Sequence, residues 1–517
     1  MEVQELLKLY AAHPQVTALD TLLKNDTSRN IFLKGLNGSG PAMTIASLFT
    51  KGRGSYVCVL NDQEEAGYFY HDLMQLTASN EVYFFPSAYR RAIKYGHVDP
   101  ANEILRTEVL SRLQDPDASF VIVTYPDALA ERVVAREVLK ENTLKISVGE
   151  KLDNMFVSDV LDEYGFEQVD YVYEPGQYAL RGSILDVFSF SYEFPYRIDF
   201  FGDEVETIRT FDVETQLSKE KLDSIYIVPE MSKNAKDSTS LLGSLPPNTF
   251  IAARDLAWCK ERIGSVWNDD PVVADEESFA DIDQMRKKLV QAEDFLREVL
   301  DFRRIHFGVR PMGTADATIH FSTQTQPIYH KNFDRVSESF HKYLDEGYAL
   351  YILSDQEKQA NRIRMIFEDR GDNIPFTAVN RTIHEGFADD TLRICFFTDH
   401  QLFDRFHKFN LKSDKARSGK ITLSLKELNQ FSQGDYIVHI DHGVGQFGGL
   451  VRTEVNGKMQ VIREDGKAIP GLYAAGDNMM SEFYGNPPTG GSAGAYFAMP
   501  FGFAAGDSAC DYLEKNK

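Results

Sequence analysis

The 517-residue sequence predicts a multidomain α/β protein on three observations. Up to residue 145, apolar strand-like runs alternate with helical patterns, which is typical of an α/β domain with a mainly parallel sheet. Short strands and tight turns follow, and they indicate an inserted β-rich domain. Near Gln460 the composition changes to Gly, Ala, Pro and aromatic residues, so we expect a truncated β barrel-like module that runs into a Gly/Ala-rich tail.

The amino-acid composition limits the classes of protein to which the chain could belong. A hydrophobic content of 43% allows several cores, at about 100 to 200 residues per domain. The four cysteines form no CxxC pair, so neither a disulfide framework nor a zinc site is indicated. No basic region followed by an apolar stretch opens the chain, and no window approaches 18 consecutive apolar residues. We therefore expect a cytoplasmic protein without a signal peptide or membrane contact.

The net charge of −23 argues against a chain that coats nucleic acid, because tight phosphate binding needs clustered Lys and Arg. Two basic runs, residues 89–94 and 405–417, are candidates for weak, local DNA contacts. The alternative for each run is a solvated loop or linker.

The first domain is expected to comprise residues 1–150 and 230–318. Its first strand leads into Gly35-Leu-Asn-Gly-Ser-Gly40, and the helical pattern Ala42–Phe49 follows. A phosphate-binding loop lies at such a strand-to-helix junction. The predicted strands are Asn30–Lys34, Ser55–Leu60, Glu81–Phe85 and Ser119–Thr124.

The glycine-rich loop lacks the residues that nucleotide hydrolysis requires. After the glycines Gly35, Gly38 and Gly40, a phosphate-binding loop needs Lys and then Ser or Thr to reach the phosphates and Mg²⁺. Pro41 has neither an ammonium group nor a backbone N–H, and Ala42 has no hydroxyl. We expect no ATP hydrolysis at this loop. The alternative role for its glycines is close packing of the strand against the helix.

Residues 151–229 carry runs that resemble a known family. The runs Glu174–Phe188, Arg197–Glu204 and Phe211–Ser218 alternate in polarity, which predicts a sheet with one exposed face. Together with the degenerate loop they resemble the N-terminal part of bacterial transcription-repair coupling factors, whose first module is similar to the excinuclease subunit UvrB. The resemblance covers residues 1–460. It implies a degenerate nucleotide-binding fold for the first domain and binding of UvrA by the inserted domain.

The resemblance also places the UvrA contact on one face of the inserted domain. Charged residues around an aromatic anchor are typical of a protein interface. For Arg181 and Arg197 the alternative is an intradomain salt bridge to Asp199 or Asp203. The residues implied in the contact are Arg181, Phe188, Arg197, Asp203 and Glu204.

A long helix is expected to close the first domain, and a small α/β domain, residues 319–405, is expected to follow it. The small domain has predicted strands at 348–353 and 392–397 around a helix at 355–370, and it shows no catalytic constellation. The long helix is predicted from apolar residues at three- and four-residue spacing: Phe279, Ile282, Met285, Leu289, Ala292, Leu296, Val299 and Leu300.

Residues 406–430 are expected to be a linker, and residues 431–460 resemble the opening strands of the family's RNA polymerase-interaction domain. The resemblance implies a contact with the polymerase β subunit, which the truncation would weaken. Residues 443–448 match GxGxxG, but a strand follows them, so we expect no dinucleotide site. His439 and His442 point to opposite sides of a strand, which argues against a metal site.

Residues 461–517 resemble the C-terminal end of flavoproteins of the fumarate reductase and succinate dehydrogenase type. The βαβ fingerprint of such enzymes has no counterpart earlier in the chain, so we expect a vestigial motif and no bound FAD. The resemblance assigns the flavin contacts to Gly476, Asp477, Gly490, Gly491 and Ser492.

Two functional hypotheses follow. The first is a truncated transcription-repair coupling factor, a DNA-repair scaffold that recruits UvrA without a motor, since GxxxxGK[ST] occurs nowhere in these residues. The second is a fragment of an FAD-dependent oxidoreductase, or a non-functional gene fusion, defined by the tail. We expect no enzymatic activity and no cofactor.

Overall fold

The computed structural model describes residues 1–411 except 26–27, 78, 80, 89–99, 116–117, 214, 230–237, 269–285, 328, 406–408 and 410. Beyond residue 411 it describes residues 436–439, 443–446, 454–455, 460–462 and 468–473. The chain divides into two units, Met1–Gly419 and Lys420–Lys517. Within the described residues, no helix has the length and apolar character needed to cross a membrane.

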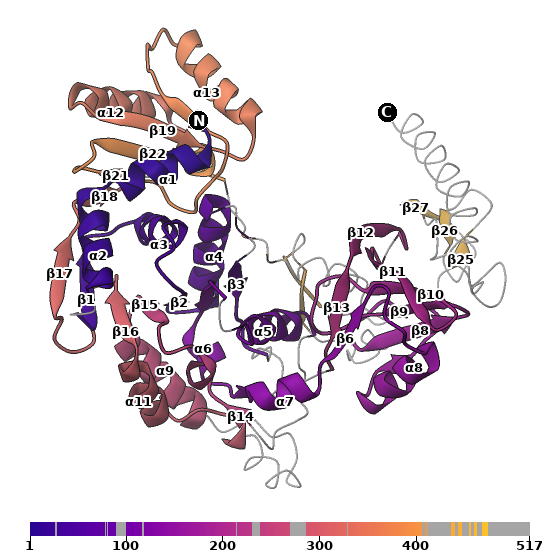
Figure 1. Ribbon diagram of the computed structural model, residues 1–517. Helices are drawn as coiled ribbons and strands as arrows, with labels where there is room; N and C mark the ends of the chain where they lie inside the picture. Colours follow the sequence, from indigo (N-terminus) through magenta and orange to yellow (C-terminus); the bar gives the residue numbers. More distant parts are fainter. Residues whose placement is uncertain are drawn as a thin grey trace. The chain divides into compact units, whose positions relative to one another are not determined.

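A seven-stranded sheet forms the centre of the first domain, in the order β17-β1-β16-β15-β2-β4-β3 (Figure 1). All neighbouring strands in it run parallel, as the sequence predicted. The central strands are buried along their length, which explains their nearly continuous apolar sequences. The strands are β1 (Asn30–Lys34), β2 (Tyr56–Val59), β3 (Val82–Phe84), β4 (Val121–Thr124), β15 (Phe250–Ala253), β16 (Arg303–His306) and β17 (Ala317–His320).

Helices pack around this sheet. Helix α3 is buried at every residue from Gly40 to Phe49, and α1 and α4 contact it. A short antiparallel pair, β5 (Val133–Val134) with β14 (Ser238–Thr239), lies outside the main sheet. The helices are α1 (Val3–Ala11), α2 (Pro14–Lys24), α3 (Gly40–Thr50), α4 (Gln63–Thr77), α5 (Pro100–Arg112), α6 (Pro126–Leu129), α7 (Arg136–Glu141), α9 (Leu256–Asn268) and α11 (Ala292–Asp301).

The prediction of one long helix before residue 301 is wrong. Helix α11 begins only at Ala292, and Leu289 forms a β-bridge with Glu131 instead. The apolar spacing that suggested a single helix combines a helical face with an extended segment that packs on the same core. Phe279, Ile282 and Met285 lie outside the described residues.

The inserted domain begins and ends with a paired strand couple, β6 (Leu144–Ser147) and β13 (Ser224–Ile227). Between them lie a helix and a six-stranded sheet in the order β12-β11-β10-β9-β8-β7. One face of this sheet packs on α8 through Val157 and Leu161. The elements are α8 (Asn154–Glu163), β7 (Glu167–Gln168), β8 (Gln177–Arg181), β9 (Ile184–Val187), β10 (Tyr196–Phe201), β11 (Glu204–Phe211) and β12 (Ser218–Leu222).

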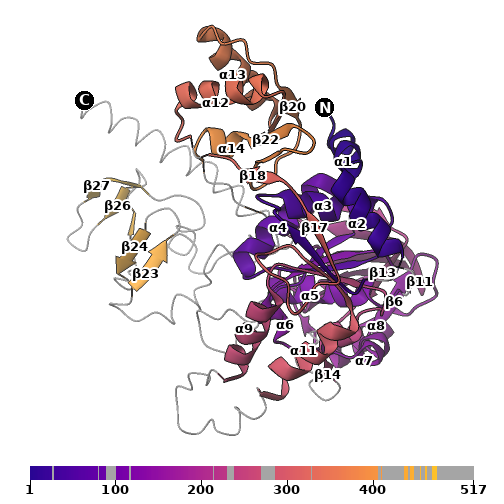
Figure 2. The same ribbon diagram turned by 90° about the vertical axis from the view of Figure 1, so that its left-hand side faces the viewer.

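A third domain has a five-stranded sheet in the order β18-β21-β22-β19-β20, with α12 and α13 beside it (Figure 2). Leu350 and Ile352 face these helices, whereas Leu353 belongs to the core of the first domain. The first and third domains therefore share a core. The elements are β18 (Thr323–Thr325), α12 (Phe333–Asp345), β19 (Ala349–Leu353), α13 (Glu357–Asp369), β20 (Thr377–Val379), β21 (Phe387–Asp389), β22 (Ile394–Thr398) and α14 (Asp399–Leu402).

The second unit contains a hairpin of β23 (Tyr436–His439) with β24 (Gly443–Gln446). The GxGxxG match therefore begins within β24, whereas the prediction placed a strand after the match. A three-stranded antiparallel sheet follows, formed by β25 (Glu454–Val455), β26 (Gln460–Ile462) and β27 (Ala468–Tyr473). This sheet continues across residue 460, where the sequence character changes.

Candidate functional site

The glycine-rich loop connects β1 to α3, and two of its glycines are required by close packing. Gly35 has a φ of +90°, and a Cβ at this position would lie 2.3 Å from the carbonyl oxygen of Phe321. Gly38 has a φ of +52°, and its Cβ would lie 2.9 Å from the carbonyl oxygen of Gly386. Both contacts are with backbone atoms, which cannot rotate away. The glycines thus permit close packing of the loop against Phe321 and Gly386, and not of β1 against α3 as the alternative had it.

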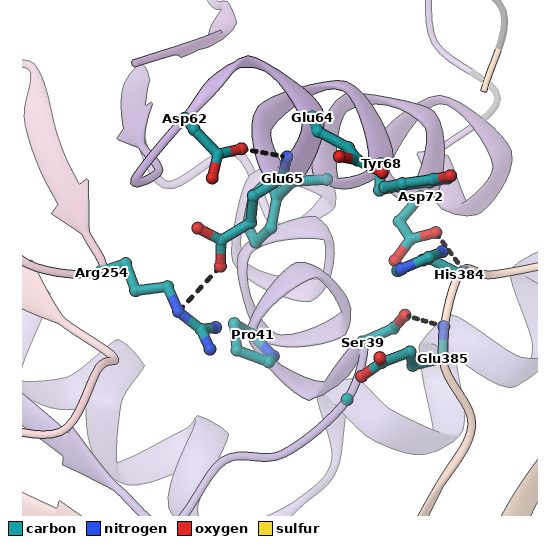
Figure 3. A pocket seen from close by; sticks show the side chains of 12 residues that line it. Ser39, Pro41, Asp62, Glu64, Glu65, Tyr68, Asp72, Arg254, His384 and Glu385 are labelled. Atoms are coloured by element: carbon teal, nitrogen blue, oxygen red, sulfur yellow. Dashed lines mark hydrogen bonds and ion pairs between the residues drawn. The ribbon is translucent and has the colours of Figure 1, made fainter. Parts of the chain in front are cut away.

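A segment of the third domain lies against this loop. The Ser39 N–H donates to the carbonyl oxygen of Glu385 at 3.0 Å, and the Glu385 N–H donates to the Ser39 Oγ at 3.0 Å (Figure 3). The Asn37 N–H donates to the Thr323 Oγ1 at 2.9 Å. Because these loop amides already have partners, they are not available to phosphate oxygens.

A pocket of about 310 Å³ opens beside the loop, and Pro41 is part of its wall (Figure 3). The only basic side chain of Lys or Arg that lines it in the described residues, Arg254, is paired through its Nε with the Glu65 carboxylate at 2.8 Å. An acidic lining of this kind repels nucleotide phosphates. The carboxylates that line the pocket belong to Asp62, Glu64, Glu65, Asp72 and Glu385.

Asp72 of α4 links this pocket to the third domain. Its carboxylate accepts a hydrogen bond from the His384 N–H at 2.6 Å, and Tyr68 stacks on the His384 ring with centroids 3.7 Å apart. Burial raises the pKa of Asp72 from 3.8 to about 7, although hydrogen bonds from Ser39 and His384 act in the opposite direction. The Glu385 charge contributes to the increase. Asp72 therefore titrates near neutral pH at an interdomain contact.

A buried His–Asp pair forms a second link between the two domains. His13 Nε2 lies 3.1 and 3.3 Å from the two carboxylate oxygens of Asp389, and both side chains are fully buried. The Gln15 N–H donates to His13 Nδ1 at 3.1 Å, so the other ring nitrogen carries the proton that is donated to Asp389. Asp389 also accepts the N–H groups of Thr391 and Leu392, both at 3.0 Å.

The outer face of the inserted sheet, opposite α8, is organised around Asp186. The Asp186 side chain is fully buried, and Arg197 forms two bonds with its carboxylate, at 2.7 and 2.8 Å. Arg181 binds the same carboxylate, and its guanidinium lies over the Tyr171 ring. The bond with Asp186 raises the pKa of Arg197 above its usual value, although burial opposes the shift.

The predicted intradomain salt bridges therefore exist, but with a different partner. Arg181 and Arg197 pair with Asp186 and not with Asp199 or Asp203. Asp199 is instead bound by Arg209 of the neighbouring strand. The partner was missed because it depends on the pairing of β9 with both β8 and β10, in which Arg197 lies directly opposite Asp186. Alternation along the hairpin puts Asp186 on the face of the arginines, and that is the signal from which it could have been found.

The prediction that Phe188 is an exposed contact is wrong. Its side chain is 1% exposed and packs with Ala179, Phe211 and Ile104, the last of these from α5 of the first domain. The resemblance grouped Phe188 with Arg181 and Arg197, and Phe188 does lie on their face of the sheet. What the sequence did not reveal is that the first domain covers that part of the face.

The turn between β10 and β11 remains open to solvent. Asp203 and Glu204 are exposed there, as a contact role requires, and Phe201 beside them is 79% exposed. Phe201 was overlooked as a site residue because it stands in an apolar run with Phe200, which is buried. The alternation of β10 continues through Phe200 and Phe201 and places Phe201 on the open side, next to the turn at Gly202.

Several predicted positions lie outside the described residues. They include the basic run 89–94, most of 405–417, His442, and the flavin contacts Gly476, Asp477, Gly490, Gly491 and Ser492. Within the described part of the chain, no group of three or more His, Cys, Asp or Glu could hold a metal ion. Cys58, Cys259 and Cys395 are free and buried.

Comparisons with known proteins match two parts of the chain to family models. The UvrB interaction domain matches residues 144–232, which contain the paired strands β6 and β13 and everything between them. The CarD-like/TRCF RID domain matches residues 431–464. Neither match extends past residue 464, and the flavoprotein resemblance of the tail is not supported.

Known relatives of the chain are consistent with these two family matches. A transcription-repair-coupling factor of Staphylococcus aureus is 23% identical over 85% of this chain and 44% of its own length. The factor of Bacillus subtilis is 23% identical over 82% of this chain and 42% of its own length. The chain is therefore homologous to transcription-repair-coupling factors over most of its length, and it spans less than half the length of these relatives.

Proposed function

We propose that this chain is a non-enzymatic scaffold of transcription-coupled DNA repair that binds UvrA through the inserted domain. The observation that carries the proposal is the match of the UvrB interaction domain to residues 144–232, which correspond to one compact sheet-and-helix domain. The match of residues 431–464 to the CarD-like/TRCF RID domain supports a second contact, with the RNA polymerase β subunit.

The surface available for UvrA is the open part of the inserted domain, near the turn between β10 and β11. Phe201 takes the anchoring role there in place of Phe188, with Asp203 and Glu204 as a charged rim. Arg181, whose side chain is 35% exposed, adds a partly available cation.

Three features support a function without ATP turnover. Pro41 and Ala42 replace the catalytic residues of a phosphate-binding loop, the Ser39 amide is bonded to the third domain, and the adjoining pocket is acidic. The recruitment of protein partners does not require ATP turnover.

Co-elution of the full chain with purified UvrA on size-exclusion chromatography tests the proposal. We expect a complex, and we expect Phe201→Ala to weaken it by about tenfold or more, as for the anchor of an interface. Trp258→Ala is the matched control, because Trp258 is an exposed aromatic of the first domain, outside the inserted domain. The absence of any complex with the unmodified chain would contradict the proposal. The same measurement with the polymerase β subunit tests the second contact.

A further inference from the structure

A cationic cleft lies at the edge of the main sheet opposite the glycine-rich loop. The residues that line it precede or begin strands: Arg29 before β1, Gly54 before β2, Phe250 at the start of β15 and Arg303 at the start of β16. The glycine-rich loop follows the other end of β1. In a parallel sheet these are opposite edges. The cleft has a volume of about 840 Å³ and is separate from the acidic pocket.

Positive charge exceeds negative charge in this cleft. Of the described residues that line it, Lys24, Arg29, Arg53 and Arg303 are positively charged and Asp301 alone carries a carboxylate. Lys24 and Arg53 share one further carboxylate, that of Asp20. Within the described part of the chain, these residues together carry two more positive than negative charges, although the net charge of the chain is −23. Such a local concentration needs an anionic partner, because like charges at close range repel.

Two of the four cations are held in place by the fold. Arg303 donates to the carbonyl oxygens of Leu22 and Leu23, at 3.1 and 2.9 Å, and its guanidinium lies over the Phe250 ring. Arg53 Nε donates to the Asp20 carboxylate at 2.5 Å. Arg53 stands between two glycines with positive φ, 68° for Gly52 and 86° for Gly54, so the turn presents it in a defined position.

The other two cations are the more accessible ones. Lys24 has a side chain that is 50% exposed, and Arg29 is exposed. The Arg29 guanidinium donates to the backbone carbonyl oxygen of Asp301, and the Arg29 backbone N–H donates to the Asp316 carboxylate at 2.8 Å, so neither bond pairs the guanidinium with a carboxylate. A structural role explains the contacts of Arg303, but it does not explain the charge of Arg29, and Lys24 has only a carboxylate that it shares with Arg53.

We propose that this cleft binds closely spaced phosphate groups, such as a nucleic-acid backbone or a free polyphosphate presents. Guanidinium and ammonium groups from separate segments are the donors that phosphate binding uses. The Lys and Arg side chains of the cleft would repel a metal ion, and the charged lining does not suit an apolar ligand. The cleft supplies a local anion site that the overall charge conceals, and it is independent of the proposed UvrA contact.

The test compares the full chain with a Lys24→Ala, Arg29→Ala double variant. Binding to a fluorescein-labelled 20-base-pair duplex is followed by anisotropy over a range of salt concentrations. Each lost phosphate contact lowers the slope of log K against log salt by about one, so we expect a decrease of about two and a loss of about tenfold or more in affinity at low salt. Arg303 is left unchanged because it holds the end of α2.

The matched control is Arg335→Ala with Lys358→Ala, which removes the same charge from exposed positions in the third domain. Thermal melts show whether each variant is folded; Lys24→Gln with Arg29→Gln, which keeps longer side chains, replaces the alanine variant if it melts early. If the two variant pairs bind DNA with equal affinity and slope, DNA does not occupy the cleft. A measurement with pyrophosphate then tests whether a free polyphosphate, and not a nucleic-acid backbone, occupies the cleft.

An increase in melting temperature with millimolar pyrophosphate, absent in the Lys24 and Arg29 variant, would support a free polyphosphate as the ligand. Loss of DNA binding in that variant alone would support a nucleic-acid backbone. If neither anion distinguishes this variant from the control, the proposal is overturned.

Discussion

Asp186 is the residue on which the outer face of the inserted sheet depends. It is fully buried and receives charge-assisted bonds from Arg181 and Arg197. Arg197 is also held by the Gln216 carbonyl oxygen at 3.1 Å and lies 4.3 Å from the centre of the Phe211 ring. The two arginines, which the sequence suggested for partner binding, thus have structural contacts that a mutation would disturb first.

Arg197→Ala should therefore lower the stability of the inserted domain. It leaves a buried carboxylate with only one remaining arginine, and breaking such a pair costs about 3 kcal/mol. Arg181→Ala, at a more exposed position, should cost roughly 1 kcal/mol. Urea denaturation of both variants measures the difference. An Arg197→Ala protein of unchanged stability with weakened UvrA binding would show that this residue contacts the partner directly.

Asp72 gives the contact between the first and third domains a dependence on pH. Its pKa is about 7 in the folded chain against an ordinary value of 3.8, so the folded chain binds one proton more between these values. Protonated Asp72 therefore adds a few kcal/mol to the free energy of unfolding. This contribution is complete below about pH 4 and is lost as the pH rises through 7.

Asp72→Asn should remove this dependence, because the amide does not titrate in the window. The free energy of unfolding, measured by denaturant titration from pH 5 to 8, should fall in the unmodified chain and change less in the variant. Asp345→Asn is the control, since Asp345 is exposed at the end of α12. Parallel pH profiles for all three proteins would rule out Asp72 as the source.

At the scale of elements, the glycine-rich loop is a packing device between β1, α3 and the third domain. Gly35→Ala should destabilise the protein by about 3 kcal/mol, because a Cβ would lie 2.3 Å from a backbone oxygen and the φ of +90° is unfavourable for alanine. Gly52→Ala is the matched control. Its φ is +68°, with nothing within 4 Å, so only about 1 kcal/mol is expected.

Both variants replace a glycine of positive φ by alanine and lose the same conformational freedom. The difference between their free energies of unfolding, measured by chemical denaturation, therefore gives the cost of the Cβ contact at Gly35. Equal destabilisation would mean that the loop moves away from Phe321 without cost. The prediction would then fail.

At the scale of the whole molecule, the shared core of the first and third domains agrees with a scaffold and not with a motor. Leu353, Phe387 and Phe396 of the third domain belong to the same hydrophobic cluster as the main sheet. Domains of a nucleotide-driven machine move relative to one another during turnover. In this chain the contact of the glycine-rich loop with Glu385 is also part of the packing between the first and third domains.

We therefore expect no DNA-stimulated ATP turnover by the purified chain. Phosphate release in the presence of duplex DNA is the measurement, and a catalytically active translocase assayed in parallel is the control. A rate of about 1 per second or more, as enzymes typically show, would contradict a non-enzymatic function.

The strands were predictable because their signal is local. The run Asn30–Lys34 was found with its boundaries, and the alternation of polarity in the inserted domain correctly indicated a sheet. The helix expected over residues 279–300 was misjudged, because an extended segment at Leu289 has apolar spacing that also fits a helix. The pairing partner Asp186 and the burial of Phe188 depend on strand register and on α5.

The sequence by itself determined the α/β character, the position and defects of the glycine-rich loop, and the resemblance of the inserted domain to an interaction module. These features depend on residue type and on short-range periodicity, which one chain displays directly. The tertiary structure decided that the loop is closed by Glu385, that Asp186 joins both arginines and that four cations meet in one cleft. The contact of Ser39 with Glu385 joins residues far apart in the chain, and those of Asp186 depend on the register of neighbouring strands, so none of them follows from short-range periodicity.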